Sequence, residues 1–249
     1  MNKKDSTFCP IPWIFQAVRN NGDVRICCQA NVTKNQGVVR HTDGSSYNAG
    51  RDDMSEARTA DFMNIVRKNM LEGRWSQECG RCQQEEESGL RSRRQYEQHW
   101  DFKFEDALRV TNEDGSIDPD KVPLVYYDLR FGNLCNLKCR MCSGLISSTW
   151  IKDEIQLKQK FPNWMPDREI GQYQKLEFDI IKNVLGKKEH FENLQFLKLT
   201  GGEPLMEEQN YQIMEQFIEW NIAKNVILDI NTNGTIFNDR LNKIAKHFS

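Results

Sequence analysis

Strand and helix patterns alternate through the second half of the chain, and this alternation is the strongest limit on its fold. The strand patterns are residues 124–131 (LVYYDLRF), 194–200 (LQFLKLT) and 225–234 (NVILDINTNG), rich in β-branched, aromatic and other apolar residues. Helical patterns are predicted at about 145–160, 167–185, 208–223 and from residue 238. Such alternation is typical of α/β proteins with a parallel sheet or barrel, whose ligands bind at the carboxyl ends of the strands.

The first of these strands is followed by three cysteines, Cys135, Cys139 and Cys142, with the spacing C-x-x-x-C-x-x-C. Thiolates bind soft metals, and both zinc sites and iron–sulfur clusters usually have four protein ligands. No fourth cysteine or histidine lies beside the three, so one coordination position is left for a group that is not protein. The alternatives are a structural zinc site completed by a distant residue and simple burial, which three cysteines within eight residues of a loop disfavour.

The second strand ends in the sequence Gly-Gly-Glu-Pro. Gly201 and Gly202 leave room for a ligand to approach the backbone. Glu203 can accept a hydrogen bond from a cationic group, and Pro204 stiffens the exit from the strand. An ordinary turn between strand and helix is the alternative, and the position of this sequence on the strand end after the cysteines weakens it.

Together, CNLKCRMC, GGEP and TNG on successive strand ends resemble the radical S-adenosylmethionine (radical SAM) superfamily. The resemblance implies that the three cysteines hold a [4Fe-4S] cluster whose fourth iron is chelated by the amino and carboxylate groups of SAM. It also implies reductive cleavage of SAM to methionine and a 5′-deoxyadenosyl radical, which abstracts hydrogen from a substrate. The implied SAM-binding residues are Gly201, Gly202, Glu203, Pro204, Asn231, Asn233 and Met141, the last standing where the family usually has an aromatic residue against adenine.

Strand alternation adds a prediction for the third strand. It points Asp229, Asn231 and Asn233 inward, while Leu228 and Ile230 pack outward. A turn that leads into the following helix is the alternative for this polar set.

The first strand has a polar face as well. Tyr126, Asp128 and Arg130 share one face, opposite Tyr127 and Leu129. In a barrel this face would reach the active site, and a buried ion pair that merely satisfies itself is the alternative.

The length of the second half departs from the family pattern. The radical SAM barrel usually has six strand–helix units, whereas residues 124–249 supply three. We therefore expect a partial (βα) barrel, its N-terminal half, with the remainder on a continuation of the chain or on a partner chain.

Five further cysteines lie in the first third of the chain: Cys9, Cys27, Cys28, Cys79 and Cys82. Residues 20–28 (NNGDVRICC) predict a hairpin with Asn-Gly in its turn. A helix is predicted from Ser55, as N-cap, to about Gly73, and it places Cys79 and Cys82 on a turn just after it.

These segments, with FCPIPW before them, resemble the twitch or SPASM type of auxiliary-cluster domain, which more often follows the barrel. The resemblance implies that Cys9, Cys27, Cys79 and Cys82 hold a second [4Fe-4S] cluster. Cys28 is then left over, or exchanges roles with Cys27. A four-cysteine zinc site fits the same spacing, so iron and zinc both remain open here.

The predicted organisation is a small α+β cysteine-rich domain over 1–111, a linker over 112–123 and the radical SAM domain over 124–249. The linker assignment rests on the Asp, Gly and Pro content of NEDGSIDPDKVP. The charged run from Glu85 to Arg94 is interpreted as a solvated face.

Composition limits the partners and the compartment. The net charge of −2 gives no reason to expect binding to nucleic acid or to an anionic membrane. No apolar run is long enough to cross a bilayer, and the start lacks the apolar region of a secretory signal. Eight cysteines fit a reducing compartment in which clustered thiols hold metal, so we expect a cytoplasmic protein.

The prediction is a radical SAM enzyme that acts on a peptide or protein. It would use SAM, two [4Fe-4S] clusters and an external one-electron reductant such as flavodoxin or ferredoxin. The second cluster, held by four cysteines, would transfer electrons. The alternatives are a non-catalytic iron–sulfur or zinc binding module and a subunit that needs a partner chain to complete its barrel.

Overall fold

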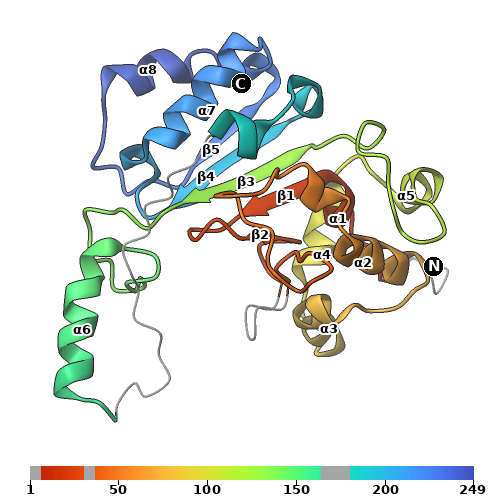
Figure 1. The fold of residues 1–249 in the computed structure, drawn as a ribbon, viewed down its shortest axis with the longest axis horizontal. Helices are drawn as coiled ribbons and strands as arrows, with labels where there is room; N and C mark the ends of the chain where they lie inside the picture. The colour runs from red at the N-terminus through yellow and green to blue at the C-terminus, as the bar shows by residue number, and fades with distance from the viewer. Residues whose placement is uncertain (1–6, 31–36, 164–179) are drawn as a thin grey trace.

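A computed structural model describes residues 7–30, 37–163 and 180–249 of the chain (Figure 1). Within these residues five strands form a sheet in the order β2-β1-β3-β4-β5. The strands are β1 (Phe15–Val18), β2 (Val24–Arg25), β3 (Tyr126–Phe131), β4 (Phe196–Gly201) and β5 (Ile227–Ile230). All neighbouring pairs are parallel except β1 and β2. The fold is therefore mixed α/β with a mostly parallel sheet, and the three predicted strands of the second half are confirmed.

The sheet runs through both predicted domains. β1 and β2 form the predicted hairpin, and β1 also pairs in parallel with β3, with Ala17 opposite Asp128. Residues 112–123, predicted as a linker, contribute the buried side chains Ile117 and Val122 to an apolar cluster that also contains Trp13. The N-terminal cysteine region is thus joined to the strand–helix units by both backbone pairing and packing.

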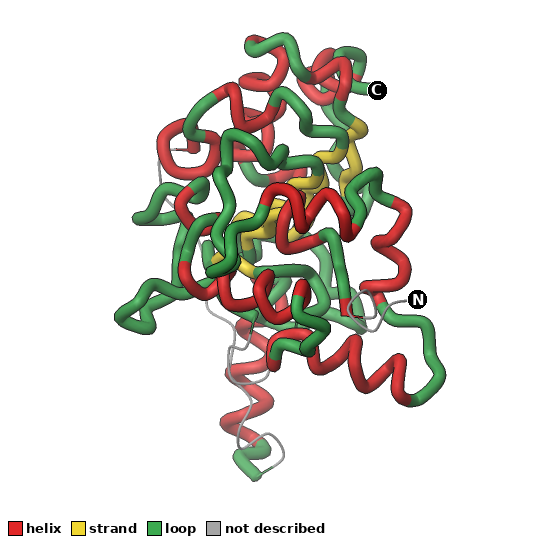
Figure 2. Tube along the Cα trace, turned by 90° about the vertical axis from the view of Figure 1, so that its right-hand side faces the viewer, coloured by secondary structure: helices red, strands yellow, loops and turns green. Residues whose placement is uncertain are grey.

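The eight helices of the described residues lie around this sheet, above and below the strands in Figure 2. They are α1 (Ile11–Ile14), α2 (Asp61–Leu71), α3 (Gly80–Glu87), α4 (Arg93–Tyr96), α5 (Phe104–Val110), α6 (Ile151–Lys160), α7 (Glu208–Glu219) and α8 (Asp239–Ala245). Helices α7 and α8 lie beside β4 and β5, whereas α6 extends away from the sheet (Figure 1). None of the helices within the described ranges is long and apolar enough to cross a membrane.

The two faces of the sheet differ in chemistry because side chains alternate along each strand. Tyr127 and Leu129 of β3 and Leu199 of β4 are buried on one face, in a core that includes Met214 and Phe217 of α7. The opposite face of the sheet carries the polar side chains discussed below. This is the division that the sequence predicted for the first strand.

Several predicted helix ends are wrong. The helix expected from Ser55 begins at Asp61, because residues 56–58 form a separate 3₁₀ turn and Ala60, at φ −57° and ψ 144°, interrupts the helical backbone. The predicted stop at Gly73 is confirmed by its φ of +73°. Cys82 lies within α3, not on a turn.

The remaining helix predictions fare unevenly. The helix expected over 145–160 begins at Ile151, after a 3₁₀ turn over 148–150. Most of the stretch predicted over 167–185 lies outside the described residues, and 180–185 form a π-helical turn. The helix expected over 208–223 ends at Glu219. The last helix is capped by Asn238, whose side chain accepts a hydrogen bond from the Leu241 N–H at 2.8 Å.

Two buried arginines hold the N-terminal region together. Arg58 donates to the carbonyls of Trp13 (2.9 Å) and Val122 (2.8 Å). Arg67 of α2 is fully buried and donates to Pro12 O (3.0 Å) and, at 3.4 Å, to the carbonyl of Gly115. Neither pairs with a carboxylate among the described residues. Backbone carbonyls are the main acceptors of both cations, and Arg67 ties the segments around Pro12 and Gly115 to α2.

Candidate functional site

The loops after β3, β4 and β5 meet at the carboxyl edge of the sheet. The Asn233 amide donates to Asn136 Oδ1 at 2.9 Å and lies 3.8 Å from Cys135 Sγ. Glu203 accepts from the Asn233 backbone N–H at 2.7 Å and from the Thr232 hydroxyl at 2.7 Å. One hydrogen-bonded chain therefore connects the cysteine, GGEP and NTNG loops that the sequence placed on three separate strand ends.

The three cysteines of the first loop lie close together but differ in exposure. Cys135 is buried, Cys142 is half-buried and Cys139 is exposed. The Cys142 N–H donates to the Cys139 carbonyl at 2.9 Å, which closes a tight turn. Burial raises the pKa of Cys142, and the neighbouring Cys139 and Cys135 thiols raise it further. The three thiols are thus near enough to influence one another, on a loop open to solvent.

A polar segment just after the cysteines braces this loop, and sequence reasoning missed it. Trp150 Nε1 donates to the Cys139 carbonyl at 3.0 Å, and the Ser148 hydroxyl accepts from the Cys135 N–H at 3.2 Å. Ser147 is buried and donates to the Leu137 carbonyl at 2.8 Å. The signal was present in the SSTW sequence, because Ser and Thr side chains readily bond nearby backbone.

The structure gives two GGEP residues roles that differ from the predicted ones. A Cβ on Gly202 would lie 2.7 Å from the carbonyl carbons of Asn133 and Leu134, so the close approach at this glycine is by the cysteine loop itself. Glu203 is fully buried, and besides Thr232 and Asn233 it accepts from the Leu205 N–H at 3.1 Å. Glu203 therefore positions the NTNG loop with a carboxylate already engaged by its own chain.

This packing makes Gly202 sensitive to the smallest substitution. We expect Gly202→Ala to lower the free energy of unfolding by about 2 kcal/mol, because overpacking against backbone cannot be relieved by a rotamer change. Urea denaturation of the full chain measures it. Gly80→Ala is the matched control, since a Cβ there meets nothing within 4 Å. Equal midpoints for the two variants would contradict the close packing of the loops.

The other predicted SAM-binding residues lie at the same edge with more freedom. Pro204 is buried at the start of a 3₁₀ turn, Met141 is 91% exposed at the tip of the cysteine loop, and Asn231 is exposed. Leu228 and Ile230 pack against the core, as alternation predicted.

The polar face of the sheet carries two ion pairs. Arg130 of β3 lies 3.1 Å from Asp128, and Lys198 of β4 pairs with Asp229 of β5. The ion pair considered as an alternative for the first strand therefore exists. Asp128 and Asp229 do point to this face, but each already has a cationic partner.

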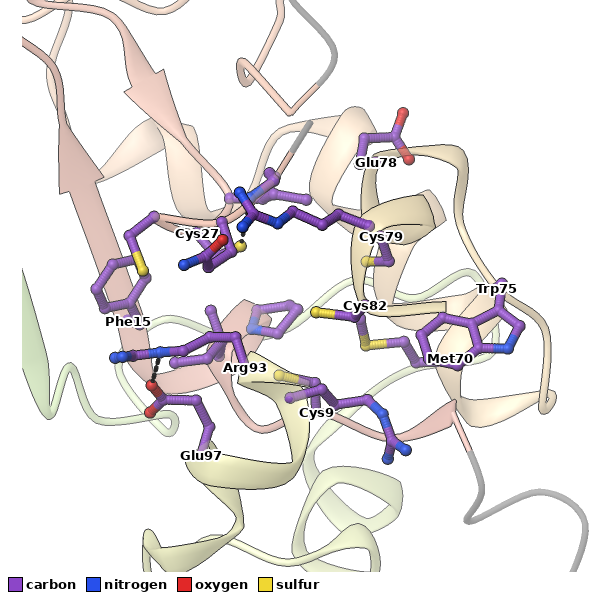
Figure 3. A pocket seen from close by; sticks show the side chains of 18 residues that line it. Cys9, Phe15, Cys27, Met70, Trp75, Glu78, Cys79, Cys82, Arg93 and Glu97 are labelled. Atoms are coloured by element: carbon purple, nitrogen blue, oxygen red, sulfur yellow. Dashed lines mark hydrogen bonds and ion pairs between the residues drawn. The ribbon is translucent and has the colours of Figure 1, made fainter. Parts of the chain in front are cut away.

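All five N-terminal cysteines line one cavity of about 30 Å³, and four of them are the predicted ligands of the second cluster (Figure 3). They are Cys9 before α1, Cys27 after the hairpin, Cys79 at the end of a 3₁₀ turn and Cys82 in α3. Burial raises the pKa of Cys27 to about 12 and holds those of Cys9 and Cys79 well above the ordinary value. The free thiols of Cys9, Cys27 and Cys79 are therefore neutral at pH 7, and metal binding there would have to release protons.

Adjacent Cys28 faces different neighbours. Burial raises the pKa of Cys28, Arg93 and Arg130 lower it, and Asp128 raises it. The charged groups that act on Cys27 are instead other cysteines, Cys28 and Cys82. The groups around Cys28 thus belong to the polar face of the sheet. Both residues that the sequence left open line the cavity, but Cys27 is the one that acts electrostatically on the Cys9 and Cys79 thiols.

The charged run beside this cavity is not simply a solvated face, which corrects that interpretation. Arg94 is buried, pairs with Glu86 and donates to the Phe8 carbonyl at 3.1 Å, next to Cys9. Arg93 pairs with the buried Glu97, and Figure 3 shows this pair beside the thiols. These paired side chains wall the cysteine cavity, which charge patterning alone could not show.

The donor sets can be compared with the metals considered. In the described ranges, no three His, Cys, Asp or Glu side chains converge closely enough to hold a single ion. Four thiolates at about 2.3 Å from one zinc would lie within about 4 Å of each other. Cysteine thiolates are the usual ligands of both structural zinc and iron–sulfur clusters, so ligand type leaves both metals open for the two cysteine groups.

Comparison of the chain with family models, with curated proteins and with solved structures finds no match.

Proposed function

We propose that the chain is a radical SAM protein whose reaction site lies at the carboxyl edge of β3, β4 and β5. The observation that carries the proposal is the hydrogen-bonded chain from Glu203 through Asn233 to Asn136 beside Cys135. It joins three sequence motifs that are far apart along the chain at the edge where α/β proteins bind ligands.

Cys135, Cys139 and Cys142 would hold a [4Fe-4S] cluster with one iron left for SAM. When bound, the cluster and SAM supply reductive cleavage of SAM and a 5′-deoxyadenosyl radical that abstracts hydrogen from the substrate. The exposure of Cys139 leaves the cluster loop accessible to an external reductant. Buried Cys135 and the Ser147–Trp150 brace fix the other side of the loop.

The four thiols of Cys9, Cys27, Cys79 and Cys82 would hold a second cluster. Four protein ligands leave no iron open, which favours electron transfer over substrate binding at that cluster. The surrounding ion pairs, Arg94 with Glu86 and Arg93 with Glu97, keep the wall of the cavity fixed.

The proposed barrel is partial within the described residues. β5 pairs with β4 on one side, and Ile227 at its start is 51% exposed. A further parallel strand added to this edge would continue the sheet toward a barrel, supplied by additional chain or by a partner.

Anaerobic reconstitution of the full chain with iron and sulfide tests the proposed function. We expect about eight irons per chain, from two four-iron clusters. With dithionite and SAM, 5′-deoxyadenosine and methionine should form, detected by chromatography. Iron binding without SAM cleavage would favour a non-catalytic module, and zinc at the N-terminal cysteines would remove the auxiliary cluster.

A further inference from the structure

A cleft of about 680 Å³ opens on the polar face of the sheet, beside the N-terminal cysteine cavity. One end is apolar and is lined by Trp100, Tyr126, Phe196 and Ile227. The other end is lined by the charged side chains of Arg93, Glu97, Asp128, Arg130, Lys198 and Asp229. The cleft is therefore amphipathic, and no residue that lines it is one of the seven proposed cluster ligands.

The apolar end is a preformed aromatic wall. The Tyr126 ring packs edge-on against Phe196 with ring centres 5.1 Å apart, and lies 5.7 Å from Trp100. Ile227, half exposed, extends this wall toward solvent. Rigid aromatic walls of this kind bind aromatic or large apolar groups at little cost in side-chain entropy.

The charged end presents mainly positive charge to the solvent. The Arg130 side chain is 37% exposed, whereas its partner Asp128 is 1% exposed. The same holds for Arg93, at 38%, and its partner Glu97, at 2%. Each carboxylate is buried beside its arginine, so the guanidinium groups are the accessible part of both pairs.

These guanidinium groups keep donors free for a ligand. Asp128 engages Nε and one terminal nitrogen of Arg130, and Glu97 engages Nε of Arg93. The other terminal nitrogens of both arginines have no acceptor in the described part of the chain. Arg93, Arg130 and Cys28 all line this cleft, so both guanidinium groups face the same space.

Lys198 and Asp229 form the third pair, with both side chains partly exposed. Here the carboxylate is more exposed (32%) than the ammonium group (21%), so this pair does not add to the positive charge, which comes from Arg93 and Arg130. A carboxylate held by two pre-oriented arginines is a strong and geometrically specific interaction.

We propose that this cleft binds a carboxylate-bearing ligand with an aromatic or large apolar group, either an amino acid or the C-terminus of a peptide. The carboxylate meets Arg93 and Arg130, and the apolar group lies on Trp100, Tyr126 and Phe196. That this ligand is the substrate rests on the proposed function. That the ligand binds in the cleft does not.

Calorimetric titration of the reconstituted full chain with N-acetyl-L-tyrosine, without SAM or dithionite, tests the proposal. We expect N-acetyl-L-tyrosinamide and N-acetylglycine, which lack the carboxylate or the ring, to bind about tenfold more weakly. Free tyrosine and the peptide Gly-Gly-Tyr separate the two sources of the carboxylate: the one that binds more tightly identifies the ligand class. Equal binding of acid and amide would overturn the proposal, as would displacement by inorganic phosphate at equal concentration.

The matched variants neutralise an ion pair without leaving a buried charge. Asp128→Asn with Arg130→Gln should weaken binding of the acid about tenfold and leave the amide unchanged. Asp106→Asn with Arg109→Gln removes an exposed pair on α5 and should change neither. Unchanged acid binding in the first variant would reject the cleft. Because SAM cleavage is measured separately, loss of cleavage with normal binding counts against the proposed function alone.

Discussion

Cys139→Ala should abolish dithionite-driven formation of 5′-deoxyadenosine by the reconstituted chain. It should also lower the iron content by about four per chain. Without Cys139 the cluster has only two protein thiolates left, and it is not retained. Chromatography of the products and a colorimetric iron assay measure both effects. The N-terminal cluster should remain, since its four thiols lie in a separate cavity.

Arg140→Ala is the control for this experiment. Arg140 is the next residue of the same loop, its side chain is exposed, and it is not a predicted ligand. It should keep both its iron and its SAM cleavage. If Cys139→Ala cleaved SAM as the native chain does, the three-cysteine site would not be the site of the chemistry.

Arg67→Met should lower the free energy of unfolding by about 3 kcal/mol. The side chain is fully buried, and its loss leaves the carbonyls of Pro12, Arg58 and Gly115 without their donor. Each stranded buried acceptor costs about 1–3 kcal/mol, partly offset by the apolar character of methionine. Urea denaturation of the full chain followed by circular dichroism measures the change.

Lys68→Met provides the matched control, because Lys68 is the adjacent residue of α2 and is exposed. The same substitution there should shift stability by less than about 0.5 kcal/mol. A small effect at Arg67 would mean that the N-terminal segment, α2 and residues 112–123 are not held together by this side chain.

Local signals predicted the local structure well. The Asn-Gly turn specified the hairpin, and runs such as LVYYDLRF specified the strands, because β-branched and aromatic residues suit a sheet. Helix starts were less predictable. Ser55 has the side chain of an N-cap, yet α2 begins at Asp61 after Arg58 turns inward to bond Trp13 and Val122. Such tertiary contacts override local preference.

The site was predictable in its members and less so in their roles. Spacing and strand order brought Cys135, Glu203 and Asn233 to one edge of the sheet. That Glu203 bonds the NTNG loop depends on contacts between residues about thirty positions apart. The pairing of Arg94 with Glu86 likewise depends on how α3 and α4 pack together, which charge order along the chain does not determine.

The most direct test of the central claim is electron paramagnetic resonance of the reduced, reconstituted chain with and without SAM. A cluster with three thiolates and one open iron should change its spectrum when SAM binds, and Cys139→Ala should lose the responsive signal. The signal of the N-terminal cluster should stay the same in both samples. An identical spectrum with and without SAM would contradict the account.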